Sequence, residues 1–262
     1  EKENSNAVYF FPKLLNQQLP KLEDISKAKK IKKVSWLDTY YFEKLINGVS
    51  LFENDSDEKR INDAFLTTVD IESGFISSQV SQRVKVSRDF SKDAEPFYMD
   101  RLYFKGKSGL FFIADGDTKL LDIALDILQH EGIGTDRNVG NGYFEFSPDE
   151  IELDLPKSSV VASLSVFCPD NKEQLENMID NEKVAYDFIK RGGWITTSPF
   201  NSYRKKTIQM FTPASVFKLE EEISNPTVIG KIVDLNPNLS FEDIDHPIWR
   251  SGRSIFIPVK LK

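Results

Sequence analysis

Hydrophobic residues recur along the chain in short runs that polar, glycine-containing stretches separate. Residues 101–104 and 109–113 have the composition of strands, and residues 105–108 between them are typical of a hairpin turn. Residues 120–128 carry leucine and isoleucine at helical spacing, with Asp117 and Thr118 as candidate caps. Residues 143–146 predict another strand. The middle of the chain therefore predicts the order strand, strand, helix, loop, strand.

The second half repeats this alternation of short β runs with a helical stretch. Strands are expected at residues 160–167, 194–197, 207–211, 228–233 and 254–259, with a helix at 172–190. Near the start, residues 38–48 predict a short amphipathic helix with Asp38 as N-cap and Gly48 after its end. The lysine-rich run 27–33 before it is either a solvated loop or a functional basic segment.

This order of elements indicates an α+β fold made of two similar-sized units, residues 1–154 and 155–262. The first unit matches the later part of a β-α-β-β-α-β pattern, and its opening strand and helix are not evident upstream. Residues 67–100 are polar, favour β structure and lack core-forming runs. Such a segment in a compact protein is usually functional or disordered.

Composition limits the possible classes of function. The 262 residues are 40% hydrophobic and 29% charged, which excludes a membrane-embedded protein, and their net charge is −7. An acidic chain argues against broad, non-specific nucleic-acid binding but is compatible with a local basic groove. Cys168 is the single cysteine and the first residues are polar, so we expect no intrachain disulfide, no signal peptide and a cytoplasmic protein.

A glycine-rich loop at residues 132–142 is the most informative segment. Gly132, Gly134, Gly140 and Gly142 allow the backbone to approach a ligand closely, and Arg137 adds a permanent positive charge. The loop follows a helix and precedes a strand and has no Gly-Lys-Ser/Thr, so it is neither a dinucleotide fingerprint nor a Walker motif. We favour contact with a sugar-phosphate backbone over a plain helix-to-strand connection.

Three further clusters combine basic and aromatic residues. Lys190 and Arg191 precede Gly192, Gly193 and Trp194, although a helix that ends at two glycines explains this group equally well. Residues 204–206 follow soon after, and residues 246–253 mix Trp249 with Arg250 and Arg253, which suits base stacking or the packing of one tryptophan under a loop. The third cluster lies in residues 83–98, where an extended hairpin would present its cations on one face.

Catalytic signals are weak. His130 is a candidate general base for RNA cleavage, but a histidine at a helix end more often complements the helix dipole. The acidic pairs Asp243/Asp245 and Asp93/Glu95 lie in polar stretches, and no recognised metal or nucleophile motif is present. We therefore predict no catalytic residue, no metal and no cofactor.

Several segments in order resemble one family. These are residues 9–13, 87–89, 95–98, 109–112, 132–144, 190–194, 205–206, 210–211, 215–217 and 246–252. Together they resemble the RAMP superfamily of CRISPR proteins, and more narrowly the subunit of type III-A (Csm) effector complexes that caps the 5′ end of the guide RNA. The equivalent subunit of type III-B complexes and the repeat-processing RAMP endoribonucleases are the alternatives.

The resemblance implies two ferredoxin-like (RRM-like) domains with a thumb-like β-hairpin inserted at about residues 67–100. It also implies a non-enzymatic subunit that holds the 5′ handle of the CRISPR RNA and meets target RNA indirectly. Its protein partners would be the large, Cas ten-type subunit and the backbone RAMP subunit. The RNA-binding residues expected on this basis are Gly132, Gly134, Arg137, Gly140, Gly142, Lys190, Arg191, Gly192, Gly193, Trp194, Lys205, Lys206, Arg250, Arg253, Arg83, Lys85, Arg88, Phe97 and Tyr98.

Overall fold

The computed structural model describes residues 7–16, 25–52, 57, 59–86, 93–134, 137–196, 199–237 and 244–261. Its contacts form two compact units, one made of Val8–Ile71 with Leu153–Lys262 and the other made of Glu1–Ala7 with Glu72–Glu152. A few helices and several sheets give the mixed α+β class that the sequence predicts. No helix in the described ranges is both long enough and apolar enough to cross a membrane.

The N-terminal sheet has the strand order β1-β2-β4-β3. Its strands are β1 (Phe10–Pro12), β2 (Trp36–Asp38), β3 (Ile61–Asn62) and β4 (Phe65–Leu66), and helices α1 (Ile25–Lys33) and α2 (Thr39–Ile46) connect them. Phe11 and Phe42 are buried and their rings stack at 4.4 Å, which packs α2 against the sheet. The lysine-rich run 27–33, for which a solvated loop was one interpretation, lies in helix α1.

Asp38 fixes the junction between β2 and α2. Its buried carboxylate accepts the backbone N–H of Tyr41 at 3.0 Å, which makes it the N-cap that the sequence predicts. The other oxygen accepts the backbone N–H of Thr68 at 2.6 Å and the Thr68 hydroxyl at 2.9 Å. Gly48 has φ +79° just after the C-cap, as expected for a residue that ends a helix.

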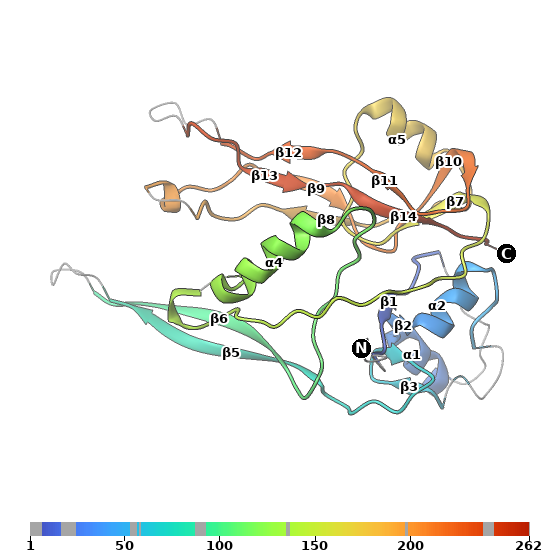
Figure 1. The fold of residues 1–262 in the computed structure, drawn as a ribbon, viewed down its shortest axis with the longest axis horizontal. Helices are drawn as coiled ribbons and strands as arrows, with labels where there is room; N and C mark the ends of the chain where they lie inside the picture. Colours follow the sequence, from blue (N-terminus) through green and yellow to red (C-terminus); the bar gives the residue numbers. More distant parts are fainter. Residues whose placement is uncertain are drawn as a thin grey trace. The chain divides into compact units, whose positions relative to one another are not determined.

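The C-terminal sheet is antiparallel, with the order β10-β7-β14-β11. Its strands are β7 (Ser158–Ser163), β10 (Val216–Ile223), β11 (Thr227–Ile229) and β14 (Ser254–Pro258), and α5 (Lys172–Ile179) packs against β10 (Figure 1). Phe167 is fully buried at the centre of the core. Its ring contacts those of Phe211, Phe217 and Phe256 at centroid distances of 5.8, 5.5 and 4.9 Å.

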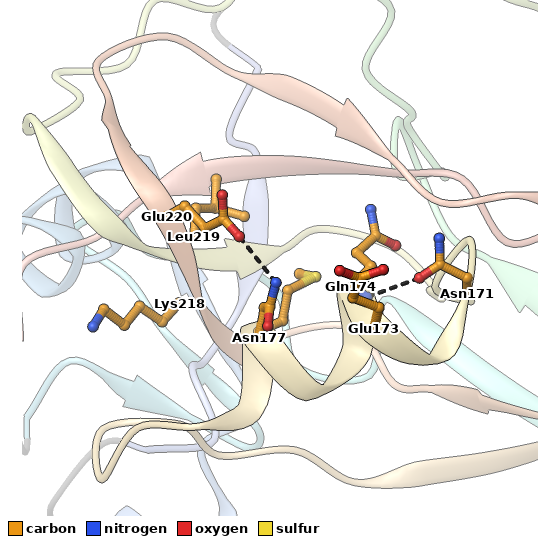
Figure 2. A pocket seen from close by; sticks show the side chains of 8 residues that line it. Asn171, Glu173, Gln174, Asn177, Lys218, Leu219 and Glu220 are labelled. Carbon is orange, nitrogen blue, oxygen red and sulfur yellow. Dashed lines mark hydrogen bonds between the residues drawn. The ribbon is translucent and has the colours of Figure 1, made fainter.

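A shallow hollow lies between α5 and β10 (Figure 2). Asn177 Nδ2 on α5 donates to Glu220 Oε1 on β10 at 2.9 Å, and at the start of α5 the Asn171 side chain caps the helix by accepting the backbone N–H of Gln174 at 2.8 Å. The polar residues of the hollow therefore help to hold α5 on β10.

Backbone hydrogen bonds join the N-terminal sheet region to the C-terminal one. The Lys260 N–H donates to Ile46 O at 2.7 Å, and the Leu15 N–H donates to Ala214 O at 3.1 Å. Asn47 Nδ2 also donates to Asp154 O at 2.8 Å. These bonds explain why residues 8–71 pack with residues 153–262. The division of the chain into two domains, residues 1–154 and 155–262, stays a prediction.

The unit around residues 72–152 contains a long hairpin, a helix and a loop. Strands β5 (Ile76–Lys85) and β6 (Glu95–Phe104) pair along their whole length, and α4 (Lys119–Glu131) and the 3₁₀ turn η1 (Arg137–Val139) follow (Figure 1). The predicted helix at 120–128 is thus confirmed. None of the hydrophobic side chains described in residues 72–152 is buried, so local pairing rather than a core of its own holds this unit.

Two strand predictions in this unit are wrong. Residues 109–113 and 143–146 are not strands, and residues 101–104 pair with β5 instead of with 109–113. A strand needs a partner for its backbone hydrogen bonds, and β5 takes that place beside β6. Without a partner strand, Leu110 and Phe112 are 76% and 61% exposed.

In the C-terminal part, the helix expected at 172–190 ends at Ile179. Residues 188–191 form strand β8 (Phe188–Arg191), which pairs with β9 (Ile208–Phe211). The strand expected at 194–197 is wrong for residues 194–196, where Trp194 forms only an isolated bridge with Arg204, and residue 197 lies outside the described residues. The run 228–233 divides into β11 and β12 (Ile232–Asp234), and β12 pairs with β13 (Trp249–Ser251). The aromatic and β-branched residues before Lys190 favour a strand once β9 is available as a partner.

We predict that Asp38→Ala lowers the free energy of unfolding by about 1–3 kcal/mol, because a helix cap and the bonds to Thr68 are lost together. Asp38→Asn should lose less, since an asparagine oxygen still accepts the Tyr41 N–H. Denaturant unfolding measures both, with Asp70→Ala at an exposed position as control. Equal stability of Asp38→Ala and the control would contradict this role.

Candidate nucleic-acid interface

The β8–β9 hairpin begins in the C-terminal core. Phe167 and Phe211 exchange two backbone hydrogen bonds, with N···O distances of 3.1 and 2.9 Å, and Phe211 pairs with Phe188 at the base of the hairpin. Further along, Lys190 pairs with Gln209 and Arg191 pairs with Ile208. The hairpin therefore carries its basic residues away from a fixed aromatic base.

Lys190 and Arg191 lie on opposite faces of this hairpin, because side chains alternate along a strand. Lys190 is exposed and shares its face with Phe188. Arg191 is half-buried and shares its face with Ile208, which packs against the cluster of Ile195, Leu235, Ile244 and Ile248. The prediction that these two cations act at a helix end is wrong, because the segment is a strand.

A β-bulge distorts the end of the hairpin. Arg191 pairs with Ile208 and Trp194 pairs with Arg204. Between these two pairs, residues 192–193 on the first strand face the three residues 205–207 on the second, which is a β-bulge. Lys205 and Lys206 lie in the longer side, and the Lys205 N–H donates to Gly193 O at 2.9 Å. A Cβ at Gly192 would lie 3.1 Å from Thr207 Oγ1, so a small residue suits this close approach.

Trp194 and Arg204 form a stacked pair at the same end. The Arg204 guanidinium carbon lies 4.7 Å from the Trp194 ring centre, which is a cation–π distance, and 53% of Trp194 is exposed. Arg204 is not among the predicted site residues. Its place directly before Lys205 and Lys206 was the one available signal, and its pairing with Trp194 depends on the bulge.

Strands β12 and β13 extend this basic region. The Lys206 N–H donates to Leu235 O at 2.8 Å, and Arg250 pairs with Val233. Trp249 is 64% exposed, so the interpretation of a tryptophan packed under a loop is wrong. Arg253 is exposed in the short connection from β13 to β14.

Asp234 places a negative charge within this basic region. Its carboxylate accepts the backbone N–H groups of Ile248 at 2.8 Å and Asn236 at 3.0 Å. These bonds, with a smaller contribution from the Lys206 charge, lower the pKa of Asp234. The carboxylate therefore stays ionised and orders the turn that leads to Trp249.

The glycine loop belongs to the other unit and is closed by its own backbone. The Ile133 N–H donates to Gly142 O at 2.9 Å, and a Cβ at Gly142 would lie 1.9 Å from Ile133 O. Gly132 and Gly142 thus allow two backbone segments to touch. Gly134 and Gly140 are open and need glycine for φ of +89° and +86°. Arg137 is exposed at the start of η1, and Thr135 and Asp136 lie outside the described residues.

The β5–β6 hairpin separates its predicted contacts between two faces. Arg83 pairs with Phe97, so these two residues share one face with Arg101, a cation that sequence reasoning missed. The backbone of Lys85 pairs with Glu95, and its side chain lies outside the described part of the structure. Tyr98 pairs with Gln82 and lies on the opposite face, where Val80 and Leu102 are also exposed. Arg88 lies outside the described residues.

The predicted residues therefore belong to two units of the chain. Lys190, Gly192, Gly193, Trp194, Lys205, Lys206 and Arg250 lie in connected strands of one unit, and the glycine loop and the β5–β6 hairpin lie in the other. Within the described residues, no group of three or more metal-ligating side chains is present. His130 is exposed in the last turn of α4.

Comparison with known proteins places the chain beside one family. Residues 157–259 match the family model for the CRISPR Csm4 C-terminal domain. The protein named "CRISPR system Cms protein Csm4" from Streptococcus thermophilus is 27% identical over 177 residues, which are 65% of this chain and 54% of that protein. A protein of the same name from Thermococcus onnurineus (strain NA1) is 26% identical over 108 residues, 40% of this chain and 34% of that protein. The chain therefore spans about half, or less, of the relatives that it matches.

A solved structure shares the fold. It is described as the crystal structure of the Csm3-Csm4 subcomplex in the type III-A CRISPR-Cas interference complex, and it superposes with a TM-score of 0.54 and 18% sequence identity. The superposition covers 97% of this chain and 80% of that one. The superposition shows a shared fold, and the match of residues 157–259 to the family model confirms the resemblance to the Csm family that the sequence indicated.

We predict that Gly142→Ala opens the glycine loop, because its Cβ has no room beside Ile133 O. Hydrogen exchange of the Ile133 amide measures this directly, and its protection should fall at least about tenfold. Gly134→Ala is the matched control, since it adds the same methyl group at a positive φ in open space and is expected to cost about 1–2 kcal/mol in backbone strain alone. Unchanged protection of Ile133 in Gly142→Ala would refute the backbone closure.

Proposed function

We propose that this chain is a non-catalytic, guide-RNA-binding subunit of a type III-A CRISPR effector complex, of the Csm4 type. In this role it holds the 5′ handle of the CRISPR RNA in the cytoplasm. The match of residues 157–259 to the Csm4 C-terminal domain supports the assignment. The observation that carries the binding role is the bulged end of the β8–β9 hairpin, which lies inside the matched region and combines an exposed tryptophan with several cations.

This hairpin end has the two components that single-stranded RNA needs. Lys190, Lys206 and Arg204 are exposed and supply positive charge for phosphate oxygens. Trp194 offers a ring face for one base, with the Arg204 guanidinium already stacked on it. Gly193 leaves room for a nucleotide beside the strand, because no atom lies within 4 Å of the place its Cβ would take, whereas the space beside Gly192 is occupied by Thr207.

The other unit supplies a second proposed contact. We assign Arg137 in the glycine loop and the Arg83 face of the β5–β6 hairpin to the guide or to the guide–target duplex. The hairpin then corresponds to the thumb insertion, and the two halves of the chain correspond to ferredoxin-like RAMP domains. The length of the β5–β6 pairing and the open positions of Gly134 and Gly140 support this part.

The protein partners proposed are a backbone RAMP subunit of the Csm3 type and the large, Cas ten-type subunit. Support for the first comes from the solved relative, which is described as part of a Csm3-Csm4 subcomplex. The repeat-processing endoribonuclease is the weaker alternative, since no partner that would make the exposed His130 a general base is seen among the described residues.

The double variant Lys190→Glu/Lys206→Glu tests the binding role. Affinity of the full chain for a fluorescent RNA with the repeat-derived handle should fall at least about tenfold, and the dependence of log K on log salt should become shallower by roughly 1.4, about 0.7 per lysine. The matched control is Lys157→Glu, at an exposed lysine 3.3 Å from Glu222 on the C-terminal sheet. Unchanged handle affinity in the double variant, or an equal loss in the control, would contradict the proposal.

A further inference from the structure

The N-terminal sheet has one buried face. Phe11, Leu37 and Leu66 are at most 2% exposed, and α2 covers them through Phe42. Side chains alternate along each strand, so the neighbouring residues point to the other face. The register pairs Pro12 with Trp36 and Trp36 with Phe65, which places Phe10, Trp36 and Phe65 together on that other face.

This second face is aromatic and partly open. The rings of Phe10 and Phe65 meet edge to face at 4.8 Å although their strands flank β2 on either side. Trp36 lies on β2 between those strands and is 42% exposed. Aromatic side chains on an open sheet face are the usual stacking platform for unpaired bases.

Positive charge borders these rings. Helix α1 ends at Lys33, three residues before Trp36, and buried Ile31 fixes the helix so that Lys29, Lys30, Lys32 and Lys33 are exposed. The Lys13 N–H donates to Ser35 O at 2.9 Å, which holds the end of β1 beside the residue that precedes Trp36.

The lysines of α1 repel one another. The helix has no acidic residue, and like charges three or four residues apart destabilise a helix. This local positive charge occurs in a chain with a net charge of −7. An anionic ligand on this surface would relieve the repulsion.

We infer that this aromatic–lysine face, made of Phe10, Trp36, Phe65 and the α1 lysines, binds single-stranded nucleic acid. Bases stack on Trp36 while phosphates contact the lysines. An acidic peptide would use the lysines but not the exposed rings, so the aromatic face favours a nucleic acid. The inference goes beyond the proposed function, because it involves neither the β8–β9 hairpin nor a guide handle.

Fluorescence anisotropy of the full chain with labelled twenty-nucleotide oligouridylate and oligothymidylate tests this inference. Trp36→Ala should weaken binding about tenfold through the loss of one stacked base, and Trp36→Phe should retain most of the affinity. Lys29→Gln/Lys32→Gln/Lys33→Gln should make the salt dependence shallower by roughly 2, about 0.7 per lysine. Equal loss for both oligonucleotides indicates shared single-strand chemistry, and a larger loss for oligouridylate indicates RNA.

The control Lys157→Gln/Lys172→Gln/Lys218→Gln removes the same charge from the C-terminal part of this unit, where Lys157 and Lys172 contact Glu222 and Glu176, and it should leave the salt dependence unchanged. Thermal unfolding verifies that each variant is folded. Unchanged affinity in both Trp36→Ala and the α1 variant would overturn the inference. So would displacement of the oligonucleotide by polyglutamate together with full binding by Trp36→Ala. The Lys190→Glu/Lys206→Glu variant tests handle binding by the β8–β9 hairpin separately. A failure of the proposed function can therefore be distinguished from a failure of this inference.

Discussion

The paired backbone hydrogen bonds between Phe167 and Phe211 are the constraint on which the candidate interface depends. They attach the β8–β9 hairpin to the aromatic core that also holds β7, β10 and β14 together. A hairpin with a fixed base can present Trp194 and Arg204 at a defined place, whereas the same residues in a loose loop would lose conformational entropy on binding. Core packing and the proposed RNA recognition are thus connected through one strand.

Much of the fold could be predicted from local pattern. Asp38 and Gly48 mark the ends of α2 because capping depends on residues close in sequence, and the periodicity at 120–128 identifies α4 for the same reason. Strand partners could not be predicted in this way. Residues 109–113 have strand composition but no partner, and residues 188–191 become a strand because β9 is beside them in space.

The candidate site was predicted in composition but not in geometry. Lys190, Trp194, Lys205 and Lys206 were named from the sequence, and the structure brings them to one hairpin. The bulge that places Trp194 opposite Arg204 has no local sequence signal. It arises because residues 204–208 contain one residue more than residues 191–194, with which they pair. The assignment of Tyr98 and Arg83 to opposite faces likewise required the register of β5 and β6.

The most direct test of the account is ultraviolet crosslinking of the CRISPR RNA in the isolated effector complex, followed by mass spectrometry of the crosslinked peptides. Crosslinks are expected from the handle nucleotides to the peptide that contains Trp194, and to Arg204–Lys206 across the bulge. Efficient crosslinking of the handle elsewhere, with none between residues 188 and 211, would contradict the central claim that this hairpin holds the guide.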